Sequence, residues 1–256
     1  MLKLLKIEWL KIKKYKAFLI LSCLFVVSII GINYLVHEIV SLKDNPLSMF
    51  TGQAFKFPKV WQTVSYLSSF LLFIPGLITI FLVSNEFSFR THRQNIIDGI
   101  SRSQFINTKI AMIFVFSLAA TMVVFLTASI FGLIEKSSLS FSYIKYIPYY
   151  FIQSVSYLSI ALLFVLLFKR SGLSIGVYFI YIFIIEDVLG VILNRYLEPL
   201  GNYLPLESAD KLIKLPISLG ITNTPQVSDI YLLISCSIWI ITCLALCKYK
   251  FEKHDL

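Results

Sequence analysis

One serine of the chain stands in a pattern that serine hydrolases use. Residues 172–176, Gly-Leu-Ser-Ile-Gly, match G-x-S-x-G, in which the serine lies between a strand and a helix. Here the pattern opens a long apolar run, and none of the three histidines lies in such a run to act as the base that a serine nucleophile needs. An intramembrane enzyme using Ser174 stays open as an alternative. We favour the interpretation that Gly172 and Gly176 let a neighbouring helix approach closely, and we predict no catalytic residue.

Motifs that bind nucleotides or metals are missing from the sequence. Neither a G-x-x-x-x-G-K-[ST] phosphate loop nor an H-E-x-x-H motif occurs. The cysteines lie inside or at the edges of apolar runs without zinc-type spacing, which is typical of small packing residues: Cys23, Cys236, Cys243 and Cys247. We therefore expect the chain itself to bind no metal and no cofactor. Any work that it performs then draws energy from a partner or from an ion gradient.

Two adjacent acids interrupt the fifth long apolar run of the chain. Glu186 and Asp187 separate Leu173–Ile185 from Val188–Leu193. Carboxylates are costly in lipid, so we expect both to face protein or a water-filled space. They are candidates for a transport pathway or its outer gate, together with Pro75 in the second run. An ion-coupled secondary transporter that uses Glu186 and Asp187 is the alternative function, although the chain shows no obvious internal repeat.

The elements that position these residues are membrane-spanning helices. Hydrophobic residues make up 57% of the 256 residues, and the mean hydropathy is +0.81. Apolar runs recur at the length of about 20 residues that a helix needs to cross a bilayer. We expect an all-α polytopic membrane protein, with residues 1–256 forming a single transmembrane domain. Its six transmembrane helices are predicted at about 17–36, 61–84, 110–134, 149–168, 173–193 and 230–247. Pro75-Gly76 should kink the second of them.

The net charge of +9 follows from basic residues at the ends of the spans. That distribution is typical of membrane topology and gives no basic stripe for nucleic acid, so the bilayer is the expected surface partner. With both termini cytoplasmic, fifteen of the 23 Lys and Arg residues fall on the cytoplasmic side, as the positive-inside rule requires. Residues 1–16 are predicted to form an interfacial amphipathic helix, with a solvated leader as the alternative.

The segment after the fifth span is too apolar for a plain loop. Residues 194–229, here called the outer segment, contain four prolines and an apolar stretch at Leu215–Ile221. We expect an extracellular helical hairpin of two short helices that dip back into the outer leaflet. Such backbone is tolerated at membrane depth only against protein or a cavity.

The long polar stretch 85–109 separates the second and third spans. Glu86 and Arg90 stand at i and i+4 with the acid first, which favours an ion pair on a helix, and Arg93 extends the same face. Asp98-Gly99 indicates a helix end, and Ser101 with Gln104 forms a capping-box pattern. We expect a short cytoplasmic helix, a glycine turn and a new helix from Ser101. An apolar face formed by Phe87, Phe89, Ile96 and Ile97 would lie on the membrane or in a groove of a partner; the alternative is an ordinary solvated loop.

This stretch resembles the cytoplasmic coupling segment of type-2 ATP-binding-cassette (ABC) transporter permeases. The resemblance rests on the residues Asn85-Glu86-Phe87, Thr91, Arg93, Asp98-Gly99-Ile100-Ser101-Arg102, Phe105 and Lys109, and on the six-span layout. The sequence departs from the family at Arg90, where relatives often have glycine before the threonine. We expect the docking geometry to depart from the family first at this residue.

The resemblance implies a membrane subunit of an ABC exporter that is not itself an enzyme. A dimer of permeases, either two copies or this chain with a sister permease, would bind two cytoplasmic ABC ATPase subunits, which hold ATP and Mg and drive a lipid, drug or peptide outward across the bacterial cytoplasmic membrane. The first, second and fifth spans would line the pathway. The residues implied to bind the ATPase or to form the turn that transmits motion are Glu86, Phe87, Arg90, Thr91, Arg93, Asp98, Gly99, Ser101 and Arg102.

Overall fold

The computed structural model describes residues 2–41, 53–216 and 227–253, and all the regular structure in these ranges is helical. In chain order the elements are α1 (Leu2–Lys13), α2 (Lys16–Ser41), α4 (Val60–Ser69), α5 (Phe73–Ser88), α6 (Thr91–Ile97), α7 (Arg102–Ile134), α8 (Tyr146–Phe168), α9 (Ser171–Ile180), the π-helix η1 (Tyr181–Ile185), α10 (Glu186–Tyr196), the 3-10 helix η2 (Leu200–Tyr203), α11 (Glu207–Asp210) and α12 (Asp229–Lys253).

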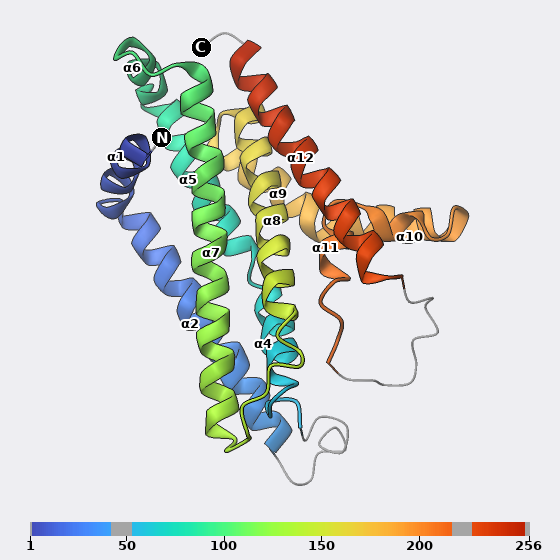
Figure 1. The fold of residues 1–256 in the computed structure, drawn as a ribbon. Helices are drawn as coiled ribbons and strands as arrows, with labels where there is room; N and C mark the ends of the chain where they lie inside the picture. Colours follow the sequence, from blue (N-terminus) through green and yellow to red (C-terminus); the bar gives the residue numbers. More distant parts are fainter. Residues whose placement is uncertain (1, 42–52, 217–226, 254–256) are drawn as a thin grey trace.

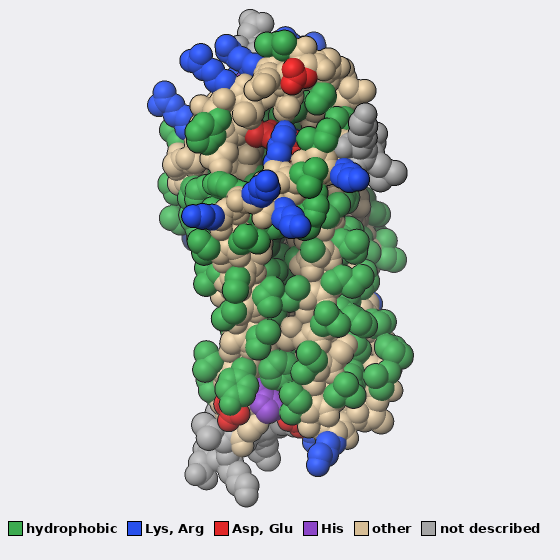
Figure 2. Space-filling model, turned by 90° about the vertical axis from the view of Figure 1, so that its left-hand side faces the viewer, with side chains coloured by type: hydrophobic (Ala, Val, Ile, Leu, Met, Phe, Trp, Pro, Cys, Tyr) green, Lys and Arg blue, Asp and Glu red, His purple; other side chains and the backbone are tan. Residues whose placement is uncertain are grey.

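Five helical stretches are long and apolar enough to cross a membrane, and the bent pair α4–α5 brings the number to as many as six. The chain is therefore an all-α polytopic membrane protein, as its hydropathy predicts. The helices form an elongated bundle in which both termini and α6 lie at one end, here called the terminal end (Figure 1). Figure 2 shows one face, where hydrophobic side chains cover the middle and Lys and Arg gather towards the terminal end.

Helix α8 forms the centre of the bundle. It contacts α4, α5, α7, α9, α11 and α12. Of its apolar 18-residue stretch, 61% is buried inside the chain, which is the largest share among the five long helical stretches. Small hydroxyl side chains on this helix, Ser154, Ser156 and Ser159, are buried. Small residues at a helix interface let the backbones of membrane helices approach closely.

The second span is broken rather than gently kinked. Helices α4 and α5 meet at 46° across residues 70–72, where Leu71, Leu72 and Ile74 bond three residues back instead of four. Pro75 is the third residue of α5 and has no amide hydrogen to donate to Leu71. The break therefore lies about one turn before the Pro75-Gly76 position at which the sequence predicts it.

The fifth span also changes course near its middle. A π-helical turn, η1, joins α9 to α10, and Glu186 is the first residue of α10. Helix α10 projects sideways from the bundle in Figure 1, and most of its apolar side chains are exposed. After it, η2 and α11 are the short helices of the outer segment that the structure describes. The part of the expected hairpin at residues 217–226 lies outside the described residues.

The close helix approach expected at Gly172 and Gly176 is wrong within this chain. No described heavy atom lies within 4 Å of a Cβ built at either position. A close approach occurs instead at Gly76, where such a Cβ would stand 2.1 Å from the hydroxyl oxygen of Tyr178 on α9. Ser174 is buried, and its hydroxyl donates to the carbonyl of Arg170 one turn earlier at 2.7 Å. It therefore satisfies a bond within its own helix.

Candidate functional site

The polar stretch between α5 and α7 folds as a short helix, a turn and a capped helix start. Helix α6 ends at Ile97, and Gly99 has a φ of +94°, a conformation that favours glycine. Ser101 caps α7: its hydroxyl accepts from the Gln104 amide at 3.2 Å, and the Ser101 amide donates to Gln104 Oε1 at 3.1 Å. The capping box fixes the direction in which α7 leaves the turn.

Arg90 ends the helix that the sequence predicts across this region. Its backbone is left-handed, with φ 55° and ψ 19°, and it separates α5 from α6. Glu86 and Arg90 are therefore not on one helix, and the ion pair expected between them is wrong, because Glu86 binds Lys109 instead. The side chain at Arg90 thus stands where the backbone favours glycine, the residue often found there in the resembling family.

Substituting Arg90 by glycine should stabilise the protein. A left-handed conformation costs a residue with a side chain roughly 1–2 kcal/mol, and the greater freedom of glycine in the unfolded chain offsets part of that gain. We expect Arg90→Gly to raise the free energy of unfolding by roughly 1 kcal/mol, measured by denaturant unfolding in detergent. Arg93→Gly, inside α6, is the matched control and should lower it by about 1 kcal/mol. Equal losses in both variants would show that the contacts of the Arg90 side chain stabilise the protein by more than its left-handed backbone costs.

A buried ion network joins three helices beneath this turn. Lys109 Nζ of α7 lies 2.6 Å from Glu8 Oε2 of α1 and 2.7 Å from Glu86 Oε1 of α5. Lys11 Nζ lies 3.1 Å from Glu8 Oε1. Lys109, Glu86 and Glu8 are only 4%, 9% and 7% exposed. The two buried carboxylates therefore depend mainly on the buried Lys109 ammonium group for neutralisation.

The charge on Glu8 follows from its partners. Burial raises the pKa of this carboxyl, but the adjacent Lys109 and Lys11 outweigh it and hold the pKa below its usual value. Glu8 is therefore ionised at neutral pH and ties α1 to the other two helices. The sequence pattern assigns no role to Glu8, although it is the only acid among the basic residues of positions 1–16.

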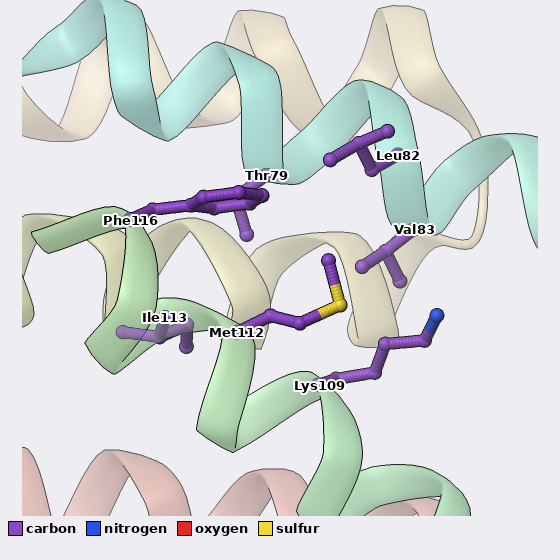
Figure 3. Close-up of a pocket in the computed structure, with 7 residues that line it drawn as sticks. All are labelled: Thr79, Leu82, Val83, Lys109, Met112, Ile113 and Phe116. Atoms are coloured by element: carbon purple, nitrogen blue, oxygen red, sulfur yellow. The ribbon is translucent and has the colours of Figure 1, made fainter. Parts of the chain in front are cut away.

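A small apolar cavity lies beside the ion network, between α5 and α7 (Figure 3). Its lining side chains are Thr79, Leu82, Val83, Lys109, Met112, Ile113 and Phe116. The free space, which includes open solvent, is about 260 Å³, and Lys109 is its single charged lining residue. Because both nearby carboxylates already bind that ammonium group, the cavity offers no free charge to a polar ligand.

Two side chains of the polar stretch 85–109 bind neighbouring helices. His92 is buried, its Nδ1 donates to the carbonyl of Glu86 at 2.9 Å, and its ring packs on Phe87 at 4.7 Å. Arg102 Nη1 donates to the carbonyl of Glu252 at 3.0 Å, near the end of α12. These contacts connect α6 to α5, and α7 to α12.

The tip of the stretch carries exposed apolar side chains. Ile97 is 83% exposed and Phe89 is 77% exposed, the two highest values among the exposed large hydrophobic residues of the described chain. Arg90, Arg93 and Asp98 beside them are also exposed. We call these five residues the tip surface. An apolar centre with charged neighbours is typical of a protein-binding patch.

The other residues singled out by the sequence lie inside the fifth span, where Glu186 and Asp187 begin α10, and inside the second span, where Pro75 lies near the start of α5. Glu186 is 3% exposed, and its Oε1 accepts from the amides of Leu206 and Glu207 in the outer segment. Asp187 is exposed, so within this chain protein surrounds Glu186 but not Asp187. Pro75 is buried at the start of α5.

Comparison with known families gives one match of large extent. Residues 4–185 match a family described as ABC-2 family transporter protein, and no curated protein matches the chain. The matched range includes all but the first two residues of α1, the ion network and the tip surface. It ends directly before Glu186.

Proposed function

The chain belongs to the ABC-2 family of transporter proteins, and from this membership we propose that it is the permease subunit of an ABC exporter whose ATP is hydrolysed on a separate chain. In this proposal the tip surface docks on a cytoplasmic ABC ATPase, which binds ATP and Mg. The permease pairs with a second copy or a sister permease in the bacterial cytoplasmic membrane, with both termini cytoplasmic. The cargo belongs to the lipid, drug or peptide class.

The exposure of Ile97 and Phe89 carries this proposal. Both lie at the terminal end, outside the stretches apolar enough to span a membrane. Burying a side chain of this size contributes about 1.5–3 kcal/mol, which a groove on a partner protein supplies. The charges of Arg90, Arg93 and Asp98 around them favour docking on a polar-rimmed groove over insertion into lipid.

The ion network explains how docking at the tip moves the spans. A push on α6 reaches α5 through His92 and Glu86, and reaches α7 through the Ser101 cap. Lys109 connects both helices to α1 through Glu8. Glu86 thus acts as a positioning residue inside the protein, and the docking contacts are left to the tip surface. Membership in the ABC-2 family and this connected path favour ATP-driven transport over ion coupling through Glu186 and Asp187.

The test is co-purification of the permease with the ABC ATPase encoded beside it. Ile97→Asp places a charge in the apolar centre of the tip surface, and we expect the amount of bound ATPase to fall about tenfold or more, since each 1.4 kcal/mol corresponds to tenfold. Leu139→Asp is the matched control, because Leu139 is 55% exposed in the loop after α7, at the opposite end of the bundle. Wild-type recovery of ATPase with Ile97→Asp would exclude the tip surface as the docking site.

A further inference from the structure

A group of polar side chains without basic partners lies where the outer segment packs on α8. Asp210 of α11 accepts from Gln153 Nε2 at 2.7 Å and from the Tyr157 hydroxyl at 3.1 Å. Both donors are neutral and belong to α8. Among residues 2–41, 53–216 and 227–253, no Lys, Arg or His stands within ion-pair distance of Asp210 or Glu186.

Glu186 of α10 binds the backbone of the same segment. Its Oε1 accepts from the amides of Leu206 and Glu207, the latter at 3.0 Å, which lie directly before and at the start of α11. The Tyr181 hydroxyl lies beside this carboxylate, and Glu186 acts electrostatically on Asp210. Glu186 thus binds the start of α11 and Asp210 is its last residue, neither carboxylate has a basic partner among the described residues, and like charges held at one four-residue helix cannot both ionise without cost.

The side-chain amide of Gln153 can adapt to a proton on Asp210. Gln153 is 2% exposed, and its Oε1 is buried without a hydrogen-bond partner among the described residues, although Nε2 of the same amide donates to Asp210. A buried acceptor without a donor costs free energy. If Asp210 carries a proton, its hydroxyl becomes a donor, and rotation of the amide brings Oε1 to it. The Gln153 amide is thus suited to both protonation states of Asp210.

We propose that Glu186 and Asp210 together form a proton-binding site. While one proton is bound, the site holds the outer segment against α8, and when that proton is lost, the segment is released. Loss of the proton leaves two carboxylates at α11 whose repulsion is relieved when α11 moves away. The docking of the outer segment on α8 would thereby depend on pH.

The direction of the pH response follows from Asp210. Burial raises the pKa of this carboxyl, the Gln153 and Tyr157 bonds lower it, and the Glu186 and Glu207 charges raise it, with a result of about 7. A pKa that is higher when the segment is docked favours docking at low pH. This contribution is complete below the ordinary pKa of 3.8 and is lost as the pH rises through about 7.

The other titratable groups near Asp210 lie on α4, α8, α10, α11 and α12. Tyr66 of α4, Tyr157 of α8 and Cys236 of α12 interact with Asp210, and phenols and thiols are neutral at these pH values. Glu207 of α11 is paired with Lys211 at 2.7 Å, so its charge is compensated. Asp187 is exposed. The titration is therefore assigned to the pair formed by Glu186 and Asp210.

Hydrogen exchange of the full chain in lipid nanodiscs tests the proposal. Protection of the amides in residues 200–213 is followed from about pH 5.5 to about pH 8.5, with labelling times corrected for intrinsic exchange, and it should fall about tenfold across the transition near neutrality. Asp210→Asn should give high protection that does not change with pH. Asp187→Asn, the neighbouring exposed acid, should titrate like the wild type. A flat wild-type profile, or an Asp210→Asn variant that titrates like the wild type, would overturn the proposal.

A second variant keeps the test decisive if Asp210→Asn does not fold. Glu186→Gln retains an acceptor for the amides of Leu206 and Glu207 but removes the charge that faces Asp210. We expect the midpoint of the exchange transition to move to lower pH. A midpoint equal to that of the wild type would show that Glu186 does not share the proton. Neither exchange measurement depends on the ATPase, so the outcomes of both are separate from the outcome of the docking test.

Discussion

Replacing Lys109 with methionine is expected to lower the free energy of unfolding by about 3–5 kcal/mol, because it leaves two buried carboxylates without their common partner. Glu8 and Glu86 approach the Lys109 ammonium at 2.6 and 2.7 Å, and Lys11 compensates them only from a more exposed position. Methionine preserves the length and the apolar stem of lysine, so the change isolates the charge. The measurement is denaturant unfolding of the purified permease in detergent, with the midpoint and slope compared to the wild type.

The matched control for this change is Lys11→Met. The Lys11 side chain is 40% exposed, so its loss should cost at most about 1 kcal/mol. Adding Glu8→Gln and Glu86→Gln to Lys109→Met should restore most of the stability, since neutral amides do not need the ammonium group. Equal losses for the two lysine variants, or no recovery in the triple variant, would contradict a structural role for the buried charge.

The same variants separate stability from coupling. If Lys109 transmits motion from α6 to α1 and α7, the stabilised triple variant should still hydrolyse ATP with its partner but respond less to cargo. The ion network joins residues that are 101 and 23 positions apart in the chain. The network thus connects α5 and α7, which flank the tip surface, to α1, and α1 leads directly into the first span.

The spans and the capped turn could be predicted because their signals are local. Helix α8 ends at Phe168 and α7 at Ile134, where the hydropathy places the ends of those spans. The Ser101–Gln104 box is a pattern of four adjacent residues, and the structure contains it. Apolar run length and cap chemistry depend only on neighbours in the sequence, so no tertiary contact was needed to recognise them.

The remaining features depend on contacts between distant segments. Spacing of four residues predicts an ion pair between Glu86 and Arg90, but the left-handed backbone of Arg90 separates them and Lys109 binds the carboxylate. The sequence pattern assigns no role to Asp210, although an acid between short apolar pieces is a usable signal of a buried polar contact. Gly172 and Gly176 showed a small-residue pattern, yet the neighbouring helix approaches Gly76 instead. Spacing alone does not tell which helix lies opposite.

Introducing a methyl group at Gly76 is expected to force α5 and α9 apart. In Gly76→Ala the new Cβ would stand 2.1 Å from the hydroxyl oxygen and 2.5 Å from Cζ of Tyr178. Tyr178 is fully buried, so its ring cannot turn away into open space. Overpacking of this kind costs about 1–3 kcal/mol, which exceeds the gain in helix propensity of at most about 1 kcal/mol. Unfolding in detergent should therefore show a net loss.

Gly176→Ala on α9 provides the matched control, since nothing lies within 4 Å of its added Cβ. The same chemical change there should raise the free energy of unfolding by up to about 1 kcal/mol. Tyr178→Phe alone should be close to neutral, because the buried hydroxyl has no hydrogen-bond partner in the part of the chain that the structure describes. It should also reduce the loss in Gly76→Ala by removing the nearest atom. If Gly76→Ala instead behaves like Gly176→Ala, the contact between α5 and α9 is not tight. If the loss is seen, α5 and α9 are tightly packed at Gly76, and any path that opens between the second and fifth spans has to break the contact of Gly76 with Tyr178.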